Sequence, residues 1–159
     1  MNAPGRLIIV CGLPGAGKTT LARTFESERG AVRFCPDEWM EAIGLSLWDE
    51  DRRSHIETLQ WKLVQSLLPQ GLVAVIEWGT WTRSERDALR KGARALGAAV
   101  ELHYLAASVD VLIDRVRRRN AEVPPIERKD IVRWHDAFQV PTRDELDLFD
   151  VASVVSARD

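Results

Sequence analysis

The stretch Gly12-Leu13-Pro14-Gly15-Ala16-Gly17-Lys18-Thr19 decides the fold of this chain. It matches the P-loop pattern of a glycine, four free positions and then Gly-Lys-Ser/Thr. The apolar, β-branched run at 7–11 comes directly before it and predicts a buried strand. The segment directly after it, residues 19–25, spaces its apolar residues as a helix does. Strand, glycine-rich loop and helix therefore follow one another in the order that the pattern requires.

The composition of this loop suits phosphate binding. Glycine permits backbone conformations that turn several N–H groups inward, and the start of the helix adds the positive end of its dipole. Lys18 is predicted to reach the β- and γ-phosphates, and the Thr19 hydroxyl to coordinate Mg²⁺. No guanine-selecting Asn-Lys-x-Asp motif is present, which favours ATP. The predicted cofactors are ATP and Mg²⁺, and the predicted nucleotide contacts are Gly12, Pro14, Gly15, Ala16, Gly17, Lys18, Thr19 and Thr20.

Length and composition set broad limits. The 159 residues predict one domain, 1–159, large enough for a sheet with helices on both faces. A hydrophobic content of 45% and a formal net charge of −2 predict a globular protein with no overall attraction to nucleic acid, although a local basic groove is compatible with both. No apolar run is long enough to span a membrane and no signal peptide is recognisable, so we expect no membrane partner and a cytoplasmic location.

The order of elements predicts the fold class. Strands are expected at 7–11, 31–35, 72–76, 99–105 and 151–155, and helices follow each of the first four. This alternation predicts an α/β fold with a five-stranded parallel sheet and helices on both faces. The strand at 99–105 alternates polar and apolar residues, which predicts a position nearer an edge.

Helix boundaries rest on capping residues. Asp37 is predicted to cap the helix after the second strand, Asp49 or Asp51 the long helix that follows, and Thr82 or Ser84 the helix up to Gly97. The apolar side of the long helix is expected to consist of Ile56, Leu59, Leu63, Leu67 and Leu68. Cys11 and Cys35 fit neither a metal spacing nor a redox pair and are expected to be small buried residues.

Two carboxylates follow neighbouring strands at the predicted ligand edge of the sheet. In open parallel sheets ligands lie at the carboxyl ends of the strands, where Asp37 and Glu77 fall. We expect Asp37 to accept the proton of an attacking hydroxyl and Glu77 to hold Mg²⁺ in the manner of a Walker B acid. The two roles could be exchanged. The structural alternatives are a helix cap for Asp37 and a solvated charge for Glu77.

Arginines and tryptophans supply further candidates. Arg115 and Arg119 share one helix face and suit the charge of a transferring phosphoryl group, although a solvated basic face would look the same. Arg83 and Arg86 follow the Glu77 strand and could contact the acceptor. Tryptophans after the second and third strands, at positions 39, 48, 78 and 81, predict an aromatic wall for the acceptor, with packing as the alternative. The predicted substrate contacts are Asp37, Trp39, Trp78, Trp81, Arg83 and Arg86; Trp61 and Trp134 are expected in the core.

These motifs together resemble the small bacterial P-loop kinases grouped with zeta toxins, chloramphenicol phosphotransferase and polynucleotide kinase domains, often labelled AAA family ATPase. The resemblance rests on the P-loop and on the segments 35–39, 75–77, 83–90 and 115–120. It implies the strand order 2-3-1-4-5, Asp37 as the base, and Arg115 and Arg119 as phosphate contacts before a short lid. The chain departs from the group in having Glu77 where Asp is common and Pro124-Pro125 in place of a basic lid.

The function predicted from these features is an ATP- and Mg²⁺-dependent kinase that phosphorylates a hydroxyl of a small molecule. Catalysis is assigned to Asp37, Lys18, Arg115 and Arg119, and the metal to Thr19 and Glu77. The acceptor is a sugar, a nucleoside or nucleotide sugar, or an antibiotic, and the protein is a monomer or homodimer. The alternatives are a polynucleotide 5′-hydroxyl kinase, which the acidic composition does not favour, and a nucleotide-gated binding module with slow ATP hydrolysis.

Overall fold

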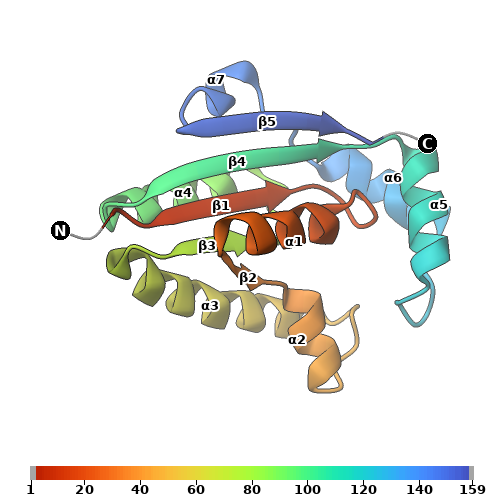
Figure 1. The fold of residues 1–159 in the computed structure, drawn as a ribbon. Coiled ribbons are helices and arrows are strands. Elements are labelled where there is room, and N and C mark those ends of the chain that lie inside the picture. The colour runs from red at the N-terminus through yellow and green to blue at the C-terminus, as the bar shows by residue number, and fades with distance from the viewer. Residues whose placement is uncertain (1–2, 158–159) are drawn as a thin grey trace.

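A computed structural model describes residues 3–157 and contains one sheet of five parallel strands. The strands run in the order β2-β3-β1-β4-β5, which confirms both the predicted fold class and the order that the resemblance implied. Figure 1 shows the sheet with the P-loop at its right-hand end, where the strand arrows point. The strand bounds are β1 Arg6–Cys11, β2 Val32–Phe34, β3 Val73–Ile76, β4 Ala99–Ala106 and β5 Val151–Ser156.

The most apolar strand, β1, lies in the middle of the sheet. It pairs with β3 from Arg6 to Ile9 and with β4 from Arg6 to Cys11. The side chains from Leu7 to Cys11 are fully buried, because helices cover both faces of this strand. The chain therefore leaves the densest part of the core directly into the P-loop.

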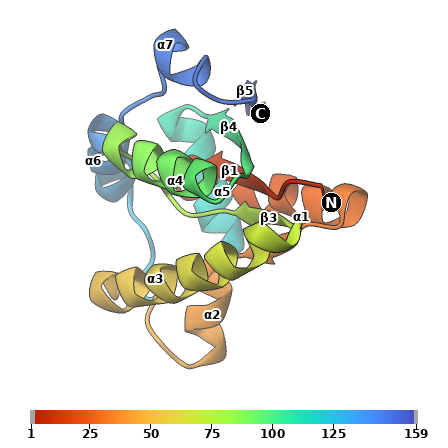
Figure 2. The same cartoon turned by 90° about the vertical axis from the view of Figure 1, so that its left-hand side faces the viewer.

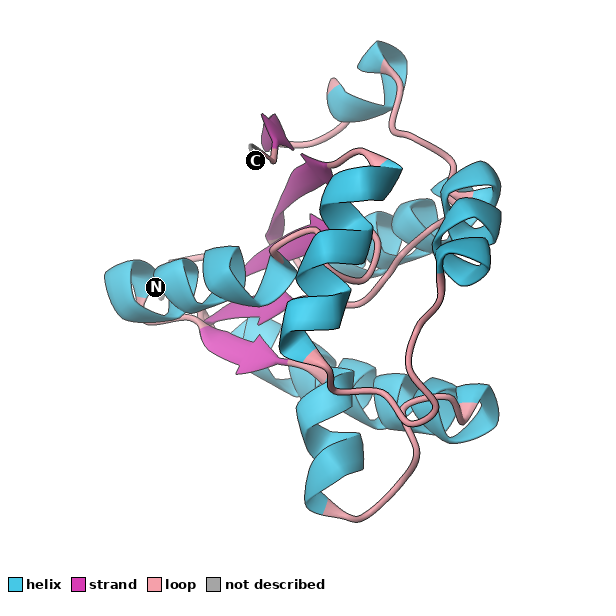
Figure 3. Cartoon of the chain, turned by 90° about the vertical axis from the view of Figure 1, so that its right-hand side faces the viewer, coloured by secondary structure: helices cyan, strands magenta, loops and turns pink. Residues whose placement is uncertain are grey.

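Helices form the two outer layers. α1 lies against β1, β2 and β3 on one face, whereas α3 and α4 lie on the opposite face (Figures 1 and 2). α5 and α6 pack on each other beyond the ends of the strand arrows (Figure 3). None of the helices within residues 3–157 is both long and apolar enough to cross a bilayer. The helix bounds are α1 Lys18–Arg29, α2 Pro36–Ala42, α3 Glu50–Leu67, α4 Arg83–Ala95, α5 Val109–Arg119, α6 Arg128–Ala137 and α7 Arg143–Leu146, with a 3₁₀ turn η1 at Leu68–Gln70.

Capping residues begin most helices where the sequence predicts them. The Asp49 carboxylate accepts from Arg52 N at the start of α3, and Thr82 forms a capping box with Glu85 at the start of α4. The start of α2 differs from the prediction. Cys35 is its N-cap and Pro36 its first residue, because the fixed φ of proline suits the first turn. Asp37 therefore lies inside the first turn, and its carboxylate is not the cap.

The packing of β4 and of α3 differs in detail from what the sequence pattern indicates. β4 lies next to the edge strand β5, nearer an edge than β1 as predicted, but it is an interior strand and its polar residue Glu101 is buried. Although burial opposes the shift, hydrogen bonds from Arg29 and His103 lower the pKa of Glu101 to about 2, so the charge is compensated inside the sheet. In α3, Leu59 and Leu63 are about half exposed, and Gln60 is buried in their place. The buried face of the helix contains Ile56, Gln60 and Val64, and Gln60 accepts a hydrogen bond from the Trp78 indole.

Candidate active site

The P-loop has the backbone shape of an anion cradle. Gly15 and Gly17 have φ angles of +87° and +101°, which side chains rarely adopt. A Cβ at Gly15 would also lie 3.0 Å from the carbonyl oxygen of Leu112. Gly17 is the N-cap of α1, and no side chain caps the first N–H groups of that helix, nor is any residue of its first turn acidic. The N-terminus of α1 is therefore available to a phosphate.

Lys18 lies across this loop. Its ammonium group donates to the carbonyl oxygens of Gly12, at 2.9 Å, and Leu13, at 3.1 Å. Burial lowers the pKa of Lys18, while the negative charges of Asp37 and Glu77 oppose that change. The ammonium group is thus a desolvated cation whose nearest balancing charges come from the ends of β2 and β3. A phosphate bound in the loop would provide the negative charge that stabilises the Lys18 ammonium group in place of water.

Thr19 and Glu77 form the candidate magnesium site. The Thr19 hydroxyl donates to one carboxylate oxygen of Glu77, and the other oxygen accepts from Arg33 at 2.9 Å. Glu77 follows β3 and is almost fully buried, so Arg33 fixes its orientation toward the P-loop. Mg²⁺ prefers oxygen ligands and usually takes only one or two from protein, the rest coming from phosphates and water. These two oxygens fit such an ion, and no larger group of ligating side chains occurs within residues 3–157.

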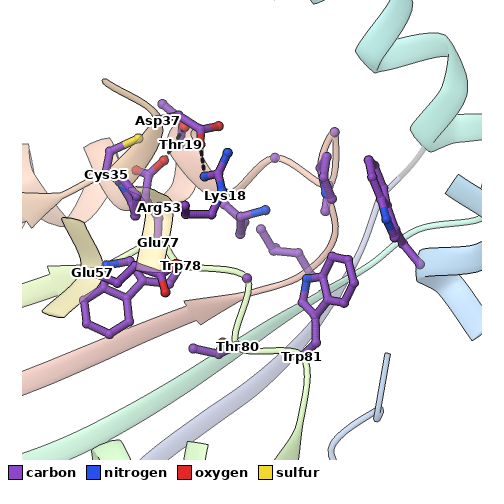
Figure 4. Close-up of a pocket in the computed structure, with 18 of the residues that line it drawn as sticks. Lys18, Thr19, Cys35, Asp37, Arg53, Glu57, Glu77, Trp78, Thr80 and Trp81 are labelled. Carbon is purple, nitrogen blue, oxygen red and sulfur yellow. Dashed lines mark hydrogen bonds and ion pairs between the residues drawn. The ribbon is translucent and has the colours of Figure 1, made fainter. Parts of the chain in front are cut away.

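Asp37 lies on the same side of the cleft as Lys18, at the end of β2. Its carboxylate pairs with the Arg53 guanidinium of α3, which also donates to the Leu47 carbonyl oxygen at 2.7 Å (Figure 4). The Asp37 side chain remains 40% exposed, so a ligand can reach it. This arrangement places one carboxylate at the metal position and another next to the space beyond the P-loop.

The helix after β4 supplies the arginines of the nucleotide side. Arg115 Nη1 donates to the carbonyl oxygens of Gly15 and Ala16, at 3.3 and 3.2 Å, and so lies against the P-loop itself. Arg119, one turn further on, pairs with Glu122 at 2.6 Å, at the start of the loop between α5 and α6. Both arginines line the cleft. Their role as phosphate contacts stays a prediction, and this position in the cleft is compatible with it.

A cavity of about 1700 Å³ connects the P-loop with a space between α3, α4 and α6. Three tryptophans form one wall: Trp134 lies 5.8 Å from Trp48 and 6.0 Å from Trp81, measured between ring centroids. Trp61 and Trp78 also line the cavity, and the Trp78 indole donates to Gln60 at 2.8 Å. An aromatic lining next to Asp37 suits the binding of an acceptor molecule.

Three predicted acceptor contacts lie elsewhere. Trp39 packs on Phe34 and does not line the cavity, because the first turn of α2 directs it toward the core. Arg83 is at the surface, 3.6 Å from Asp87. Arg86 is fully buried and pairs with Glu145, which is itself buried. The spacing of α4 turns Arg86 away from the cavity, and this corrects its predicted position.

Arg86 instead fixes the loop that carries the aromatic wall. It donates to the backbone oxygens of Thr80, at 2.9 Å, and Gln139, at 2.7 Å. Thr80 has a φ of +45°, a conformation rare for a residue with a branched side chain. The buried guanidinium therefore stabilises the strained turn directly before Trp81.

Arg53, Glu57 and Trp134 are among the cavity residues that sequence reasoning missed. Arg53 and Glu57 lie four residues apart on α3, a spacing that predicts a shared face but not which partner that face meets. Trp134 occupies a position in α6 that looks like packing. Its orientation depends on how α6 meets the loop after β3, where Gln139 N donates to the Trp81 carbonyl oxygen.

Fold and site define a P-loop nucleotide-binding domain of the α/β type. The AAA_33 family, described as an AAA domain, matches residues 7–141. The chain therefore belongs to this family. No curated protein is significantly similar to it in sequence.

Several solved structures share the fold. A gluconokinase from Sinorhizobium meliloti is 20% identical, with 98% of this chain and 84% of that one covered and a TM-score of 0.63. The Mycobacterium tuberculosis APS kinase CysC, in complex with AMPPNP and APS, is 15% identical, with 96% and 89% covered and a TM-score of 0.64. A chain of the Pnkp1/Rnl/Hen1 RNA repair complex is 20% identical, with 86% and 45% covered and a TM-score of 0.73. At these identities the likeness establishes the fold alone.

Proposed function

We propose that this protein is an ATP- and Mg²⁺-dependent phosphotransferase that moves the γ-phosphate of ATP to a hydroxyl group of a small molecule. The observation that carries the proposal is the position of Asp37, an accessible carboxylate at the junction between the P-loop and a tryptophan-lined cavity. A nucleotide hydrolase needs no such cavity. The kinases that share this fold make the reaction type a natural one for it.

The residues divide the reaction among them. Asp37 accepts the proton of the acceptor hydroxyl. At the same time the oxygen of that hydroxyl forms a bond to the γ-phosphorus, and the bond from this phosphorus to the ADP oxygen breaks. Lys18 and Arg115 stabilise the negative charge on the phosphoryl oxygens. Thr19 and Glu77 would hold Mg²⁺, which neutralises phosphate charge when it is bound.

Two further arginines of the cleft, Arg53 and Arg119, each pair with a carboxylate. Arg53 orients Asp37, because the pair fixes the carboxylate at the entrance to the acceptor space. Arg119 is held by Glu122 in the loop that follows α5, and exchange of that partner for a phosphate would draw the loop over the nucleotide.

The test is acceptor-dependent ADP formation. The protein is incubated with ATP, Mg²⁺ and each member of a panel of hydroxyl compounds, and the Asp37→Asn variant is compared with the wild type. We expect at least one acceptor to accelerate ADP release, and Asn at position 37 to lower kcat by about 10²-fold, the usual contribution of a general base. ADP release that no acceptor changes would support the nucleotide-gated module instead.

The polynucleotide 5′-hydroxyl kinase is the second candidate, because a chain of an RNA repair complex shares the fold. Such an enzyme binds a phosphate backbone through basic side chains, with affinity that falls steeply as salt rises. The acceptor side of the cavity contains Glu50, Glu57 and Glu85. This acidic lining favours a small molecule, and salt-dependent binding of single strands would reverse the choice.

A further inference from the structure

One carboxylate in the acceptor half of the cavity has no partner. Glu57 is half-buried on α3, one turn beyond Arg53, and lines the cavity. Within residues 3–157 it makes no hydrogen bond and no ion pair. A charged group that is largely removed from water without compensation is costly, so native proteins rarely leave one idle. Figure 4 shows Glu57 and Arg53 on one side of the cavity and Trp81 on the other.

The guanidinium groups around the cavity already have partners. Arg53 holds Asp37, Arg119 holds Glu122, and Arg133 lies 3.6 Å from Asp130. Arg115 contacts the P-loop carbonyl oxygens on the nucleotide side. An anionic acceptor would need a cation that is not already paired, and the acceptor half offers none among these groups.

The negative charges of this half remain uncompensated. Burial, together with the nearby charges of Glu85, Glu50 and Asp37, raises the pKa of Glu57 to about 7, although Arg53 opposes the change. A neutral hydroxyl could donate a hydrogen bond to Glu57 but would not relieve this repulsion between like charges. A cation would do both.

The aromatic wall has the same preference. The indole rings of Trp48 and Trp81 lie 5.8 and 6.0 Å from the ring of Trp134, between centroids, and all three border the cavity. The faces of tryptophan rings attract cations more strongly than those of other side chains, especially where water is excluded. The Glu57 carboxylate and the tryptophan rings therefore both favour a positively charged group.

We propose that the hydroxyl acceptor of this protein carries a protonated amino group, which pairs with Glu57 inside the tryptophan-lined cavity while the hydroxyl reaches Asp37. The acceptor class is thus an amino alcohol, an amino sugar included. The inference rests on the proposed phosphotransferase function and deepens it. It separates this chain from the gluconokinase and the APS kinase that share its fold, because gluconate and APS are anions.

The test compares matched compounds on three skeletons: a hexose, a cyclohexanol and a propanol. For each skeleton the series contains the primary amine, its N-acetylated form, the compound with a hydroxyl in place of the amine (the diol of the smaller skeletons) and a carboxylate. For the hexose these are glucosamine, N-acetylglucosamine, glucose and gluconate. Binding is followed by calorimetry without nucleotide, and phosphoryl transfer by ADP release. We expect an amine to bind and react best, and N-acetylation to lower affinity and kcat/KM by about ten-fold or more, the value of a charge-assisted contact.

Glu57→Gln assigns the effect to the residue. It should weaken binding of the amine by about ten-fold or more and leave the N-acetylated compound within about two-fold of the wild type, since only the charged contact is lost. Glu28→Gln, an exposed change on α1 outside the cavity, is the matched control and should alter neither. A single cooperative thermal transition in both variants shows that they fold.

The outcomes distinguish the two proposals. Glu57-dependent amine binding without phosphoryl transfer would sustain the acceptor class and refute the kinase. Transfer to a diol or a carboxylate at least as fast as to the matched amine would sustain the kinase and overturn the acceptor class. Absence of both binding and transfer for every compound of the panel would overturn both.

Discussion

Asp37 and Glu77 follow neighbouring strands, and their contacts give them different roles. Glu77 accepts from the Thr19 hydroxyl and pairs with Arg33, so we assign it to the proposed metal site. Asp37 lies beside Arg53 and remains accessible from the acceptor space. The sequence left the two roles interchangeable. The contacts support our assignment of Asp37 as the base.

We expect substitution of these two carboxylates to affect different kinetic quantities. Glu77→Gln should raise the Mg²⁺ concentration needed for half-maximal rate by about ten-fold, because one metal ligand is weakened. Asp37→Asn should lower kcat with no change in the Mg²⁺ requirement. Titration of the rate with Mg²⁺ for both variants checks this. If Asp37→Asn raised the Mg²⁺ requirement and Glu77→Gln lowered only kcat, Asp37 would be the metal ligand and Glu77 the base.

Glu57 should make stability depend on pH. Its pKa is raised from 4.5 to about 7 in the folded protein, so the folded state binds more protons than the unfolded state between these values. The resulting stabilisation is complete at low pH and is lost as pH rises through 7. Relative to Glu57→Gln, the thermal midpoint of the wild type should therefore fall by about 2–6 °C between pH 5 and pH 8.

Thermal scans of both proteins at these two pH values measure the difference. Arg53, Glu50, Asp37 and Glu85 face Glu57 and are unchanged in the variant. If the difference in thermal midpoint between the wild type and Glu57→Gln were the same at both pH values, the raised pKa of Glu57 would be contradicted.

The residue-level predictions succeeded where local chemistry decides position. Asp37 and Glu77 could be found because each directly follows an apolar strand, and strand ends meet at one edge of a parallel sheet. Arg53 and Glu57 could not be found, because they project from the middle of a helix. The leucines of α3 indicated a different buried face from the observed one, which contains Ile56, Gln60 and Val64. Gln60 accepts a hydrogen bond from the Trp78 indole on that face.

At the scale of elements, the loop from Glu77 to Trp81 depends on one buried ion pair. Arg86 of α4 and Glu145 of α7 join this loop to the segment after α6 through the oxygens of Thr80 and Gln139. Neither side chain is exposed. The pair therefore sets the position of the Trp81 wall although neither residue contacts the cavity.

We expect Arg86→Met to destabilise the protein by about 3–5 kcal/mol, because Glu145 would remain as an uncompensated buried charge. The double variant Arg86→Met with Glu145→Gln should recover part of this loss, since the stranded charge is removed. Urea denaturation of the two variants and the wild type gives the free energies. A single variant that lost less than about 1 kcal/mol would show that the pair is not needed.

Element types and the strand order were predicted correctly, but the burial of the polar residues of one strand was not. The alternation in β4 arises from Glu101 and His103, which are buried because Arg6, Arg29 and Ser153 provide their partners. Alternation usually indicates one solvated face, and here an internal ion cluster produces the same pattern. These partners lie on β1, α1 and β5, far away in the sequence.

For the whole molecule, the fold joins two binding spaces at one edge of the sheet. The central strand β1 places the P-loop between the ends of β3 and β4, and the helices α3, α4 and α6 surround the neighbouring cavity. The first space follows from a motif and could be predicted. The second is formed by side chains from four separate segments, so its charge and shape became visible only in three dimensions.

The central claim is that a phosphoryl group passes from a nucleotide in the P-loop to an acceptor beside Asp37. The most direct measurement is mass spectrometry of the acceptor after incubation with ATP and Mg²⁺, for the wild type and for Lys18→Ala. We predict that the wild type adds one phosphoryl group to the acceptor and that the variant, which lacks the cation that binds the transferring phosphate, adds none. Release of ADP and inorganic phosphate with the acceptor unmodified, or equal product from both proteins, would contradict the account.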